Sequence, residues 1–161
     1  MLDLKIKNET MKYKSTKIFD NFSVALRQHK AAHSHCQLLH GYALKFKVWF
    51  EADSLDEMNW VVDFGGFKDA PKGNGLKSWM NDMFDHTLLI EQDDPYLDIF
   101  QQLEQMKICK LIILEKAGCE SLAKLVFDKF NDRLSKTNAG RTRVVKVEVF
   151  ENDKNSAIYE Q

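Results

Sequence analysis

A cluster of histidines beside a cysteine is the first feature of this sequence that could carry chemistry. The stretch His29–Leu44 reads HKAAHSHCQLLHGYAL and holds four of the five histidines and one of the three cysteines. Imidazole nitrogen and thiolate sulfur are ligands of zinc, and a catalytic zinc keeps three protein ligands and one open position. A thiolate beside an imidazolium is instead a nucleophile or an acid–base group. The stretch therefore predicts a metal site or a thiol–imidazole site, and a solvated histidine-rich loop is the alternative.

Two further positions combine residue types that transfer protons or bind heterocycles. Asp85 and His86 put a carboxylate beside an imidazole at the end of a predicted helix, which can orient the ring as a general acid or base. A helix-terminal salt link or cap is the structural alternative. Glu151 ends the last predicted strand, where its carboxylate could accept hydrogen bonds from a ring N–H and an amino group. The alternative is an ordinary exposed glutamate at a strand end.

Length and charge limit the possible classes of protein. The 161 residues predict a single domain over 1–161, with residues 1–15 as a flexible N-terminal extension. The 23 Lys and Arg residues are interspersed with 24 Asp and Glu residues, which does not favour a nucleic-acid partner. No apolar run approaches the roughly 20 residues of a membrane span, and the lysine-rich N-terminus does not resemble a secretory signal. We therefore expect a soluble, cytoplasmic protein without a membrane partner.

The cysteines indicate reduced thiols. Three is an odd number, and the spacing is not regular, so a disulfide framework is not favoured. Cys109 and Cys119 have apolar neighbours and are interpreted as small buried hydrophobic residues. Cys36 differs from them because its neighbours are histidines.

Hydrophobic periodicity predicts the elements that would position these residues. Alternation is clearest over 42–50, with Tyr42, Leu44 and Phe46 on one face and Lys45 and Lys47 on the other. The other predicted strands are 18–26, 60–64 as a hairpin partner of 42–50, a buried strand at 111–115, and 143–151 with Val145, Val147, Val149 and Glu151 on one side. The predicted helices are one from Leu76 that ends near the stretch DHTLL (85–89), one that starts at Pro95, and 119–134, which Asn138–Gly140 closes. This order predicts an α+β fold with helices on one face of a mainly antiparallel sheet, and no glycine-rich phosphate loop is present.

Taken in order, the motifs resemble the 6-pyruvoyltetrahydropterin synthase and 6-carboxytetrahydropterin synthase family. That family carries F-x-A-x-H, C-x-x-x-H-G-H, V-x-D-F, D-H, and a glutamate ahead of a late tyrosine. The matching stretches cover nearly the whole chain and read FSVAL (22–26), CQLLHGY (36–42), WVVDF (60–64), FDHTLL (84–89), CESLAKLVF (119–127) and VFENDKNSAIY (149–159).

The resemblance implies a fold, an assembly and a substrate. It implies the tunnelling fold (T-fold), a four-stranded antiparallel sheet with helices on one side, whose subunits form a dimer of rings, a homo-oligomer expected to be a hexamer. It implies an active site between subunits, a zinc ion held by three histidines, and 7,8-dihydroneopterin triphosphate or a relative as the substrate.

The resemblance also implies a role for each matching residue. Cys36 matches the proton-transferring cysteine, and Asp85 with His86 match the Asp–His pair. Glu151 matches the glutamate that anchors the pterin ring, and Glu120 matches the glutamate of the helix after the P-T-x-E turn, which here reads AGCE.

The zinc positions are where this sequence departs from the family. His40 matches one zinc ligand, but Leu26 and Tyr42 stand where the family has the other two histidines. Leucine cannot bind a metal, and a neutral tyrosine is a poor zinc ligand. His33 and His35 lie just before Cys36 and are the candidates that could complete a substitute site with His40.

Two functions follow from the resemblance. The first is a carbon–oxygen or carbon–carbon lyase that acts on a dihydropterin, or on another purine-like heterocycle, by proton transfer from Cys36, Asp85 and His86. The second is a metal-free pterin- or purine-binding protein with changed or lost catalysis. The pathway, whether queuosine, biopterin or folate synthesis, stays open at this point.

Overall fold

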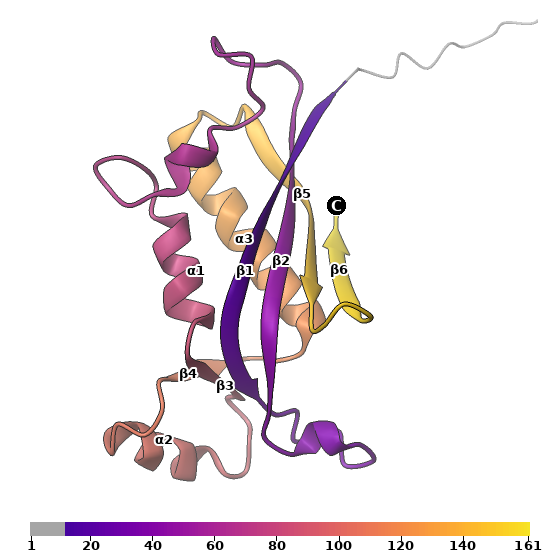
Figure 1. The fold of residues 1–161 in the computed structure, drawn as a ribbon, viewed down its shortest axis with the longest axis vertical. Helices are drawn as coiled ribbons and strands as arrows, with labels where there is room; N and C mark the ends of the chain where they lie inside the picture. Colours follow the sequence, from indigo (N-terminus) through magenta and orange to yellow (C-terminus); the bar gives the residue numbers. More distant parts are fainter. Residues whose placement is uncertain (1–11) are drawn as a thin grey trace, which may run out of the picture.

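The computed structural model describes residues 12–161, which form one six-stranded sheet with three helices (Figure 1). The sheet order is β4-β3-β1-β2-β5-β6. The ladders β1–β2, β2–β5 and β5–β6 are antiparallel, whereas β1–β3 and β3–β4 are parallel. The strands are β1 (Tyr13–Leu26), β2 (His40–Ala52), β3 (Thr87–Glu91), β4 (Leu111–Leu114), β5 (Thr142–Phe150) and β6 (Ser156–Glu160).

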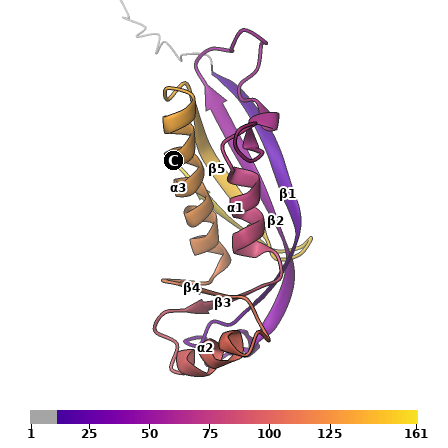
Figure 2. The same ribbon diagram turned by 90° about the vertical axis from the view of Figure 1, so that its left-hand side faces the viewer.

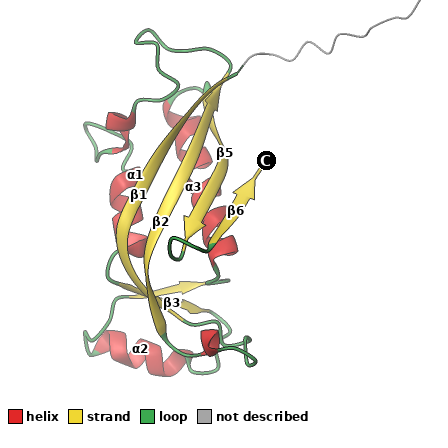
Figure 3. Ribbon diagram, turned by 45° about the vertical axis from the view of Figure 1, so that its right-hand side comes forward, coloured by secondary structure: helices red, strands yellow, loops and turns green. Residues whose placement is uncertain are grey.

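The helices lie on one face of the long strands and at one end of the sheet. The helices α1 (Leu76–Phe84) and α3 (Cys119–Thr137) cover the same face of β1, β2 and β5, as Figure 2 shows. The helix α2 (Leu97–Gln105) lies at the end of the molecule near β3 and β4 (Figure 3). Two 3₁₀ turns, η1 (His35–Gln37) and η2 (Phe64–Phe67), lie in the connections.

The core lies between the long strands and the two covering helices. Every second residue of β2 from Leu44 to Phe50 is fully buried, as the period-two pattern predicts. Phe130 of α3 meets Phe19 of β1 edge to face, with ring centroids 5.5 Å apart, and also packs on Phe67 of η2. A second, smaller cluster joins α2 to β3 and β4 through Phe100, Ile90 and Leu111.

The α+β class and helices on one face of the sheet are confirmed, but the sheet has six strands rather than four. The strand β3 was missed because all five of its residues are buried, so it has no alternation to reveal it. The strand β6 was missed because it is a short edge strand of half-buried and exposed residues.

The predicted hairpin partner at 60–64 is wrong. Both edges of β2 are occupied by β1 and β5, and the chain from Trp60 to Asp63 is irregular. Side chains satisfy this backbone instead of a strand ladder: the guanidinium of Arg141 donates to the carbonyl oxygens of Trp60, at 3.2 Å, and Val61, at 3.0 Å. The carboxylate of Asp63 accepts from the N–H of Gly65 and caps η2.

Three element details also differ from the sequence prediction. A bulge in β5 leaves Val145 between the paired residues Val144 and Lys146, so Val144 is buried in place of Val145. The helix α2 begins at Leu97, two residues after Pro95. The strand β4 lies at the sheet edge and is not fully buried, because the side chain of Ile113 is 44% exposed.

Part of the predicted N-terminal extension belongs to the sheet. Residues 1–11 lie outside the described residues, whereas Tyr13–Ser15 are the first residues of β1 and pair with the end of β2. Among the helices described over 12–161, none has the length and apolar character that a membrane span requires.

Candidate active site

The register of β1 and β2 brings three positions of the family motif onto one face. Leu26 pairs directly with His40, and Val24 pairs with Tyr42. Directly opposed residues of an antiparallel ladder point to the same face, as do residues two apart along a strand. Leu26, His40 and Tyr42 therefore share the face that α1 and α3 cover, at the end of the sheet where β2 begins.

These three side chains do not fit a zinc ion. Leu26 offers no donor and is 3% exposed within the core. The Nδ1 of His40 lies 2.8 Å from the carbonyl oxygen of Leu38, which can only accept, so this nitrogen carries the proton and donates. Burial raises the pKa of the Tyr42 phenol, and the nearby negative charge of Glu151 raises it further, so the phenol stays neutral. One imidazole nitrogen is left where a catalytic zinc needs three protein ligands.

Cys36 is held by the loop between β1 and β2. It lies in η1, where its N–H donates to the hydroxyl of Ser34 at 3.1 Å. Its carbonyl oxygen accepts from the N–H of Gln28 at 2.8 Å. The residue is half-buried, which leaves the thiol accessible beside the start of β2.

Cys119 and Glu151 form the buried polar contact of the site. The Sγ of Cys119, at the first turn of α3, lies 3.7 Å from Oε1 of Glu151, which follows β5. Burial raises the pKa of the Cys119 thiol to about 12, and the charge and hydrogen bond of Glu151 and the charge of Glu120 act in the same direction. The thiol is therefore protonated at neutral pH and donates to the carboxylate.

The groups near the Tyr42 phenol are those that act on its pKa. After burial, these are the carboxylate of Glu151 and, in their ionised forms, the thiols of Cys36 and Cys119. The ring of His40 meets that of Tyr42 edge to face at 5.1 Å. We call Cys36, Tyr42, Cys119 and Glu151 the thiol–carboxylate cluster. It combines a carboxylate acceptor with two thiols and a phenol, groups that can bind a heterocycle and move protons.

The predicted Asp85–His86 pair forms a hydrogen bond of its own. His86 Nδ1 is 2.9 Å from Oδ1 of Asp85, in the turn between α1 and β3. The carboxylate orients the ring and leaves Nε2 free, and the His86 side chain is 82% exposed. Within residues 12–161, the hydrogen bonds and ion pairs of this pair do not extend to Cys36.

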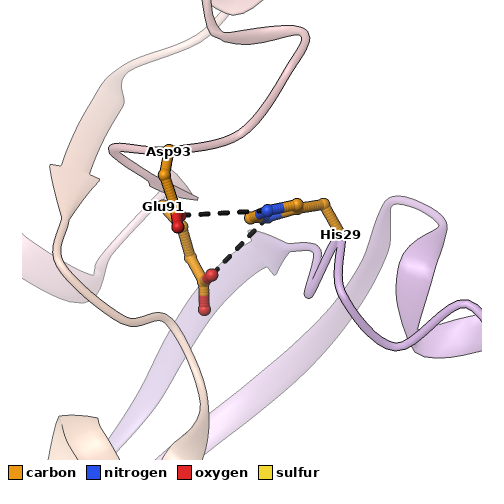
Figure 4. A group of neighbouring side chains, drawn as sticks. All are labelled: His29, Glu91 and Asp93. Atoms are coloured by element: carbon orange, nitrogen blue, oxygen red, sulfur yellow. Dashed lines mark ion pairs between the residues drawn. The ribbon is translucent and has the colours of Figure 1, made fainter.

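The substitute zinc site predicted from His33, His35 and His40 stays a prediction. His33 and His35 are exposed loop residues. In the part of the chain that the structure describes, one group of three candidate donors comes together, and it consists of His29, Glu91 and Asp93 (Figure 4). Sequence analysis missed this group because Glu91 ends β3, a strand that it did not predict.

Sequence analysis assigned Cys119 a packing role only and missed its contact with Glu151. Its burial is confirmed, because the residue is 6% exposed, but it is more than a small apolar side chain. The signal available in the sequence was the neighbouring Glu120, which occupies a family position in the first turn of α3 and is exposed.

Comparison with known proteins identifies the family. The family profile described as 6-pyruvoyl tetrahydropterin synthase matches residues 15–161. A 6-carboxy-5,6,7,8-tetrahydropterin synthase of Aquifex aeolicus is 30% identical over 131 residues, which are 78% of this chain and 76% of that protein. The protein of the same name from Rickettsia bellii is 39% identical over 69 residues, 43% of this chain, and the match spans 45% of that protein's length.

Solved structures of similar shape show the same fold. An uncharacterized protein from Wolinella succinogenes has a TM-score of 0.75 at 19% identity, over 94% of this chain and 99% of that one. The 6-pyruvoyl tetrahydropterin synthase of Caenorhabditis elegans has a TM-score of 0.60 at 19% identity, over 94% of this chain and 96% of that one. The predicted resemblance is thus confirmed: the chain belongs to the 6-pyruvoyl tetrahydropterin synthase family and has its tunnelling fold.

Proposed function

We propose that this protein is an enzyme of the tetrahydropterin synthase type that acts on a dihydropterin. The observation that carries the proposal is the thiol–carboxylate cluster, in which the carboxylate of Glu151 lies beside the protonated thiol of Cys119 and close to Cys36 and Tyr42. The names of the curated relatives, which are 6-carboxy-5,6,7,8-tetrahydropterin synthases, support the substrate class.

Three residues of the cluster have separate parts in this proposal. Glu151 accepts hydrogen bonds from the ring N–H and amino group of the pterin, because an ionised carboxylate has two acceptor oxygens. Cys119 donates to one of these oxygens and so positions the carboxylate. Cys36, half-buried at the edge of the cluster, exchanges a proton with the side chain of the substrate.

The Asp85–His86 pair completes the proton transfer from another copy of the chain. Because the His86 side chain is 82% exposed and, within residues 12–161, hydrogen-bonds to Asp85 rather than to Cys36, it is free to enter a site formed between subunits. Asp85 then keeps the ring in one tautomer, with Nε2 facing the substrate. The homo-oligomer, a hexamer by resemblance, stays a prediction that mass photometry would test.

The proposed reaction is a lyase reaction on 7,8-dihydroneopterin triphosphate or a relative, and it uses no step through zinc at the family position. A metal would serve there as a Lewis acid for the side-chain oxygens, but Leu26 and Tyr42 do not supply its ligands. The product shows whether a carbon–oxygen or a carbon–carbon bond is cleaved, and the following experiment identifies the product.

The test is turnover of 7,8-dihydroneopterin triphosphate, with products identified by chromatography and mass spectrometry. We expect Cys36→Ala to bind the substrate but to lose at least 100-fold in kcat, because proton transfer by a positioned group contributes about 10²–10⁴-fold. We expect Glu151→Gln to weaken binding and His33→Ala, an exposed loop variant, to behave as the parent. Unchanged kcat in Cys36→Ala would contradict the proposal.

The alternative is a metal-free pterin- or purine-binding protein. The lost zinc ligands favour it, because a binder needs the carboxylate of Glu151 but no Lewis acid. Calorimetric titration of the parent with a dihydropterin separates the two functions. Binding that depends on Glu151 without any product, in the presence of Cys36, would support the binding protein and exclude the enzyme for that ligand.

A further inference from the structure

Three segments of the chain meet at His29, outside the thiol–carboxylate cluster. Nδ1 of His29, in the loop after β1, lies 3.5 Å from Oε2 of Glu91 at the end of β3. Nε2 of the same ring lies 3.9 Å from Oδ1 of Asp93, two residues further along (Figure 4). One ligand atom from each of these three residues can be chosen so that all lie within 4.8 Å of one another.

The imidazole is buried, and its inner nitrogen lies near carboxylates without a hydrogen bond to them. The His29 side chain is 10% exposed and that of Glu91 is 7% exposed. Among residues 12–161, Nδ1 of His29 has no hydrogen-bond partner, although the ring points at two carboxylates. A buried polar atom without a partner is costly, so a bound group that satisfies Nδ1 would stabilise this arrangement.

The spacing of the donors is close to that of a metal site. Ligands about 2.0–2.1 Å from a tetrahedral zinc ion lie roughly 3.4 Å apart. The separation of 3.5 Å between His29 and Glu91 is already near this value. The side chain of Asp93 is 46% exposed, so it can rotate to bring an oxygen within reach of the same ion.

We propose that His29, Glu91 and Asp93 bind a divalent transition-metal ion such as zinc, at a site separate from the histidine positions of the family. Imidazole nitrogen with carboxylate oxygen is a donor set for zinc and its neighbours in the periodic table, whereas calcium and magnesium take oxygen ligands. Three protein ligands leave a fourth position for water.

The surrounding charges allow the ion to enter. Lys116 Nζ lies 3.6 Å from Glu91 and 3.9 Å from Asp93, and Lys30 pairs with Asp93. Both lysine side chains are about half exposed, at 46% and 60%, so their ammonium groups can move into water when a metal replaces them. The Lys30–Asp93 pair is exposed and contributes little. Beside buried Glu91, the metal ion would replace Lys116 as the cation. The buried neighbour Asp94 keeps its own partner, Arg27, at 2.9 Å.

A metal ion at this site would lie beside the two segments that lead to Cys36 and Cys119 of the thiol–carboxylate cluster. Gln28, beside His29, donates its N–H to the carbonyl oxygen of Cys36 at 2.8 Å. The N–H of Ala117, two residues before Cys119, donates to Oε1 of Glu91 at 3.2 Å. One proposed ligand, Glu91, thus contacts the segment that leads to Cys119, and the neighbour of another, Gln28, contacts Cys36.

The test is titration of metal-free protein with zinc, followed by calorimetry and by measured metal content. We expect one zinc per chain in the parent. We expect His29→Ala and Asp93→Asn to bind at least about tenfold more weakly, because each loses a ligand. His33→Ala from the same loop and Asp98→Asn, an exposed carboxylate of α2, are the matched controls and should bind as the parent does.

X-ray absorption of the zinc-loaded parent tests the ligand set directly. We expect nitrogen and oxygen neighbours at about 2.0–2.1 Å and no sulfur at about 2.3 Å. Asp93 is exposed, so Asp93→Asn should fold, and circular dichroism checks this for both variants. Absence of zinc binding by the parent, a sulfur ligand, or loss of binding in His40→Ala but not in His29→Ala would overturn the proposal. None of these readouts depends on turnover of a pterin.

Discussion

Restoring the two missing histidines should create a zinc site at the start of β2. The double change Leu26→His and Tyr42→His places three imidazoles on one face, because Leu26 pairs with His40 and Tyr42 is two residues further along β2. The variant is best made in a His29→Ala background, so that zinc at the site proposed above does not contribute to the result.

The structure gives the expected size of the effect. Leu26 is 3% exposed, so replacing it with a polar ring should cost about 2–3 kcal/mol of unfolding free energy without metal. Zinc at 100 times its dissociation constant should return about 2.7 kcal/mol. For a domain of this size, 1 kcal/mol corresponds to about 2–4 °C in Tm, so we expect a loss of roughly 5–10 °C and a similar gain with zinc.

Thermal unfolding with and without zinc measures both effects. Leu26→Ala in the same background is the control, because it removes the same buried side chain but supplies no ligand. A zinc-dependent rise in Tm that is no larger in the two-histidine variant than in this control would refute the reasoning that the three positions converge.

Two other predictions concern single side chains. Cys119 should resist alkylation at pH 8 in the folded protein and should react once the protein is unfolded. The reason is that its burial and its pKa of about 12 keep it from forming a thiolate. Mass spectrometry of labelled peptides measures this, and rapid labelling of the folded protein would contradict it. Burial raises the pKa of Glu51, but the hydrogen bond and charge of Lys12 and those of Arg143 outweigh it and leave the pKa below its usual value. The stability that Glu51 provides is therefore complete above its unfolded pKa of about 4.3 and is lost as the pH falls through the folded pKa. Glu51→Gln should cost about 1 kcal/mol at pH 7, because its cationic partners are exposed, and should flatten the acid side of the stability profile, as denaturant unfolding at several pH values would measure.

The elements that sequence analysis predicted best have a regular pattern with one buried face. The alternation of 42–50 became the centre of β2, and the helix predicted from the periodicity of Leu76 to Phe84 is α1. The strand β3 could not be found in this way, because its two faces are both covered and its five residues are all buried. The irregular segment 60–63 was mistaken for a strand because its apolar residues pack as a loop, held by Arg141.

Within the candidate site, the sequence predicted the residues that belong to the family motifs but not the contacts between them. Glu151 and Cys36 were named from the sequence, and both raise the pKa of Tyr42. The contact between Cys119 and Glu151 joins residues 32 positions apart, so it depends on how α3 and the end of β5 meet. No spacing along the chain could have revealed it.

The same reasoning explains why a metal would lie at His29 and not between β1 and β2. Leu26 extends the apolar core to the last residue of β1, so the end of this strand is stabilised by packing and needs no ion. Three residues later, His29 lies in a loop whose neighbours Glu91 and Asp94 are buried carboxylates. Buried carboxylates require cations, and Arg27 and Lys116 supply two of them at present. Two buried carboxylates that require positive charge therefore lie near the loop after β1, which is where the donors of the proposed metal site lie.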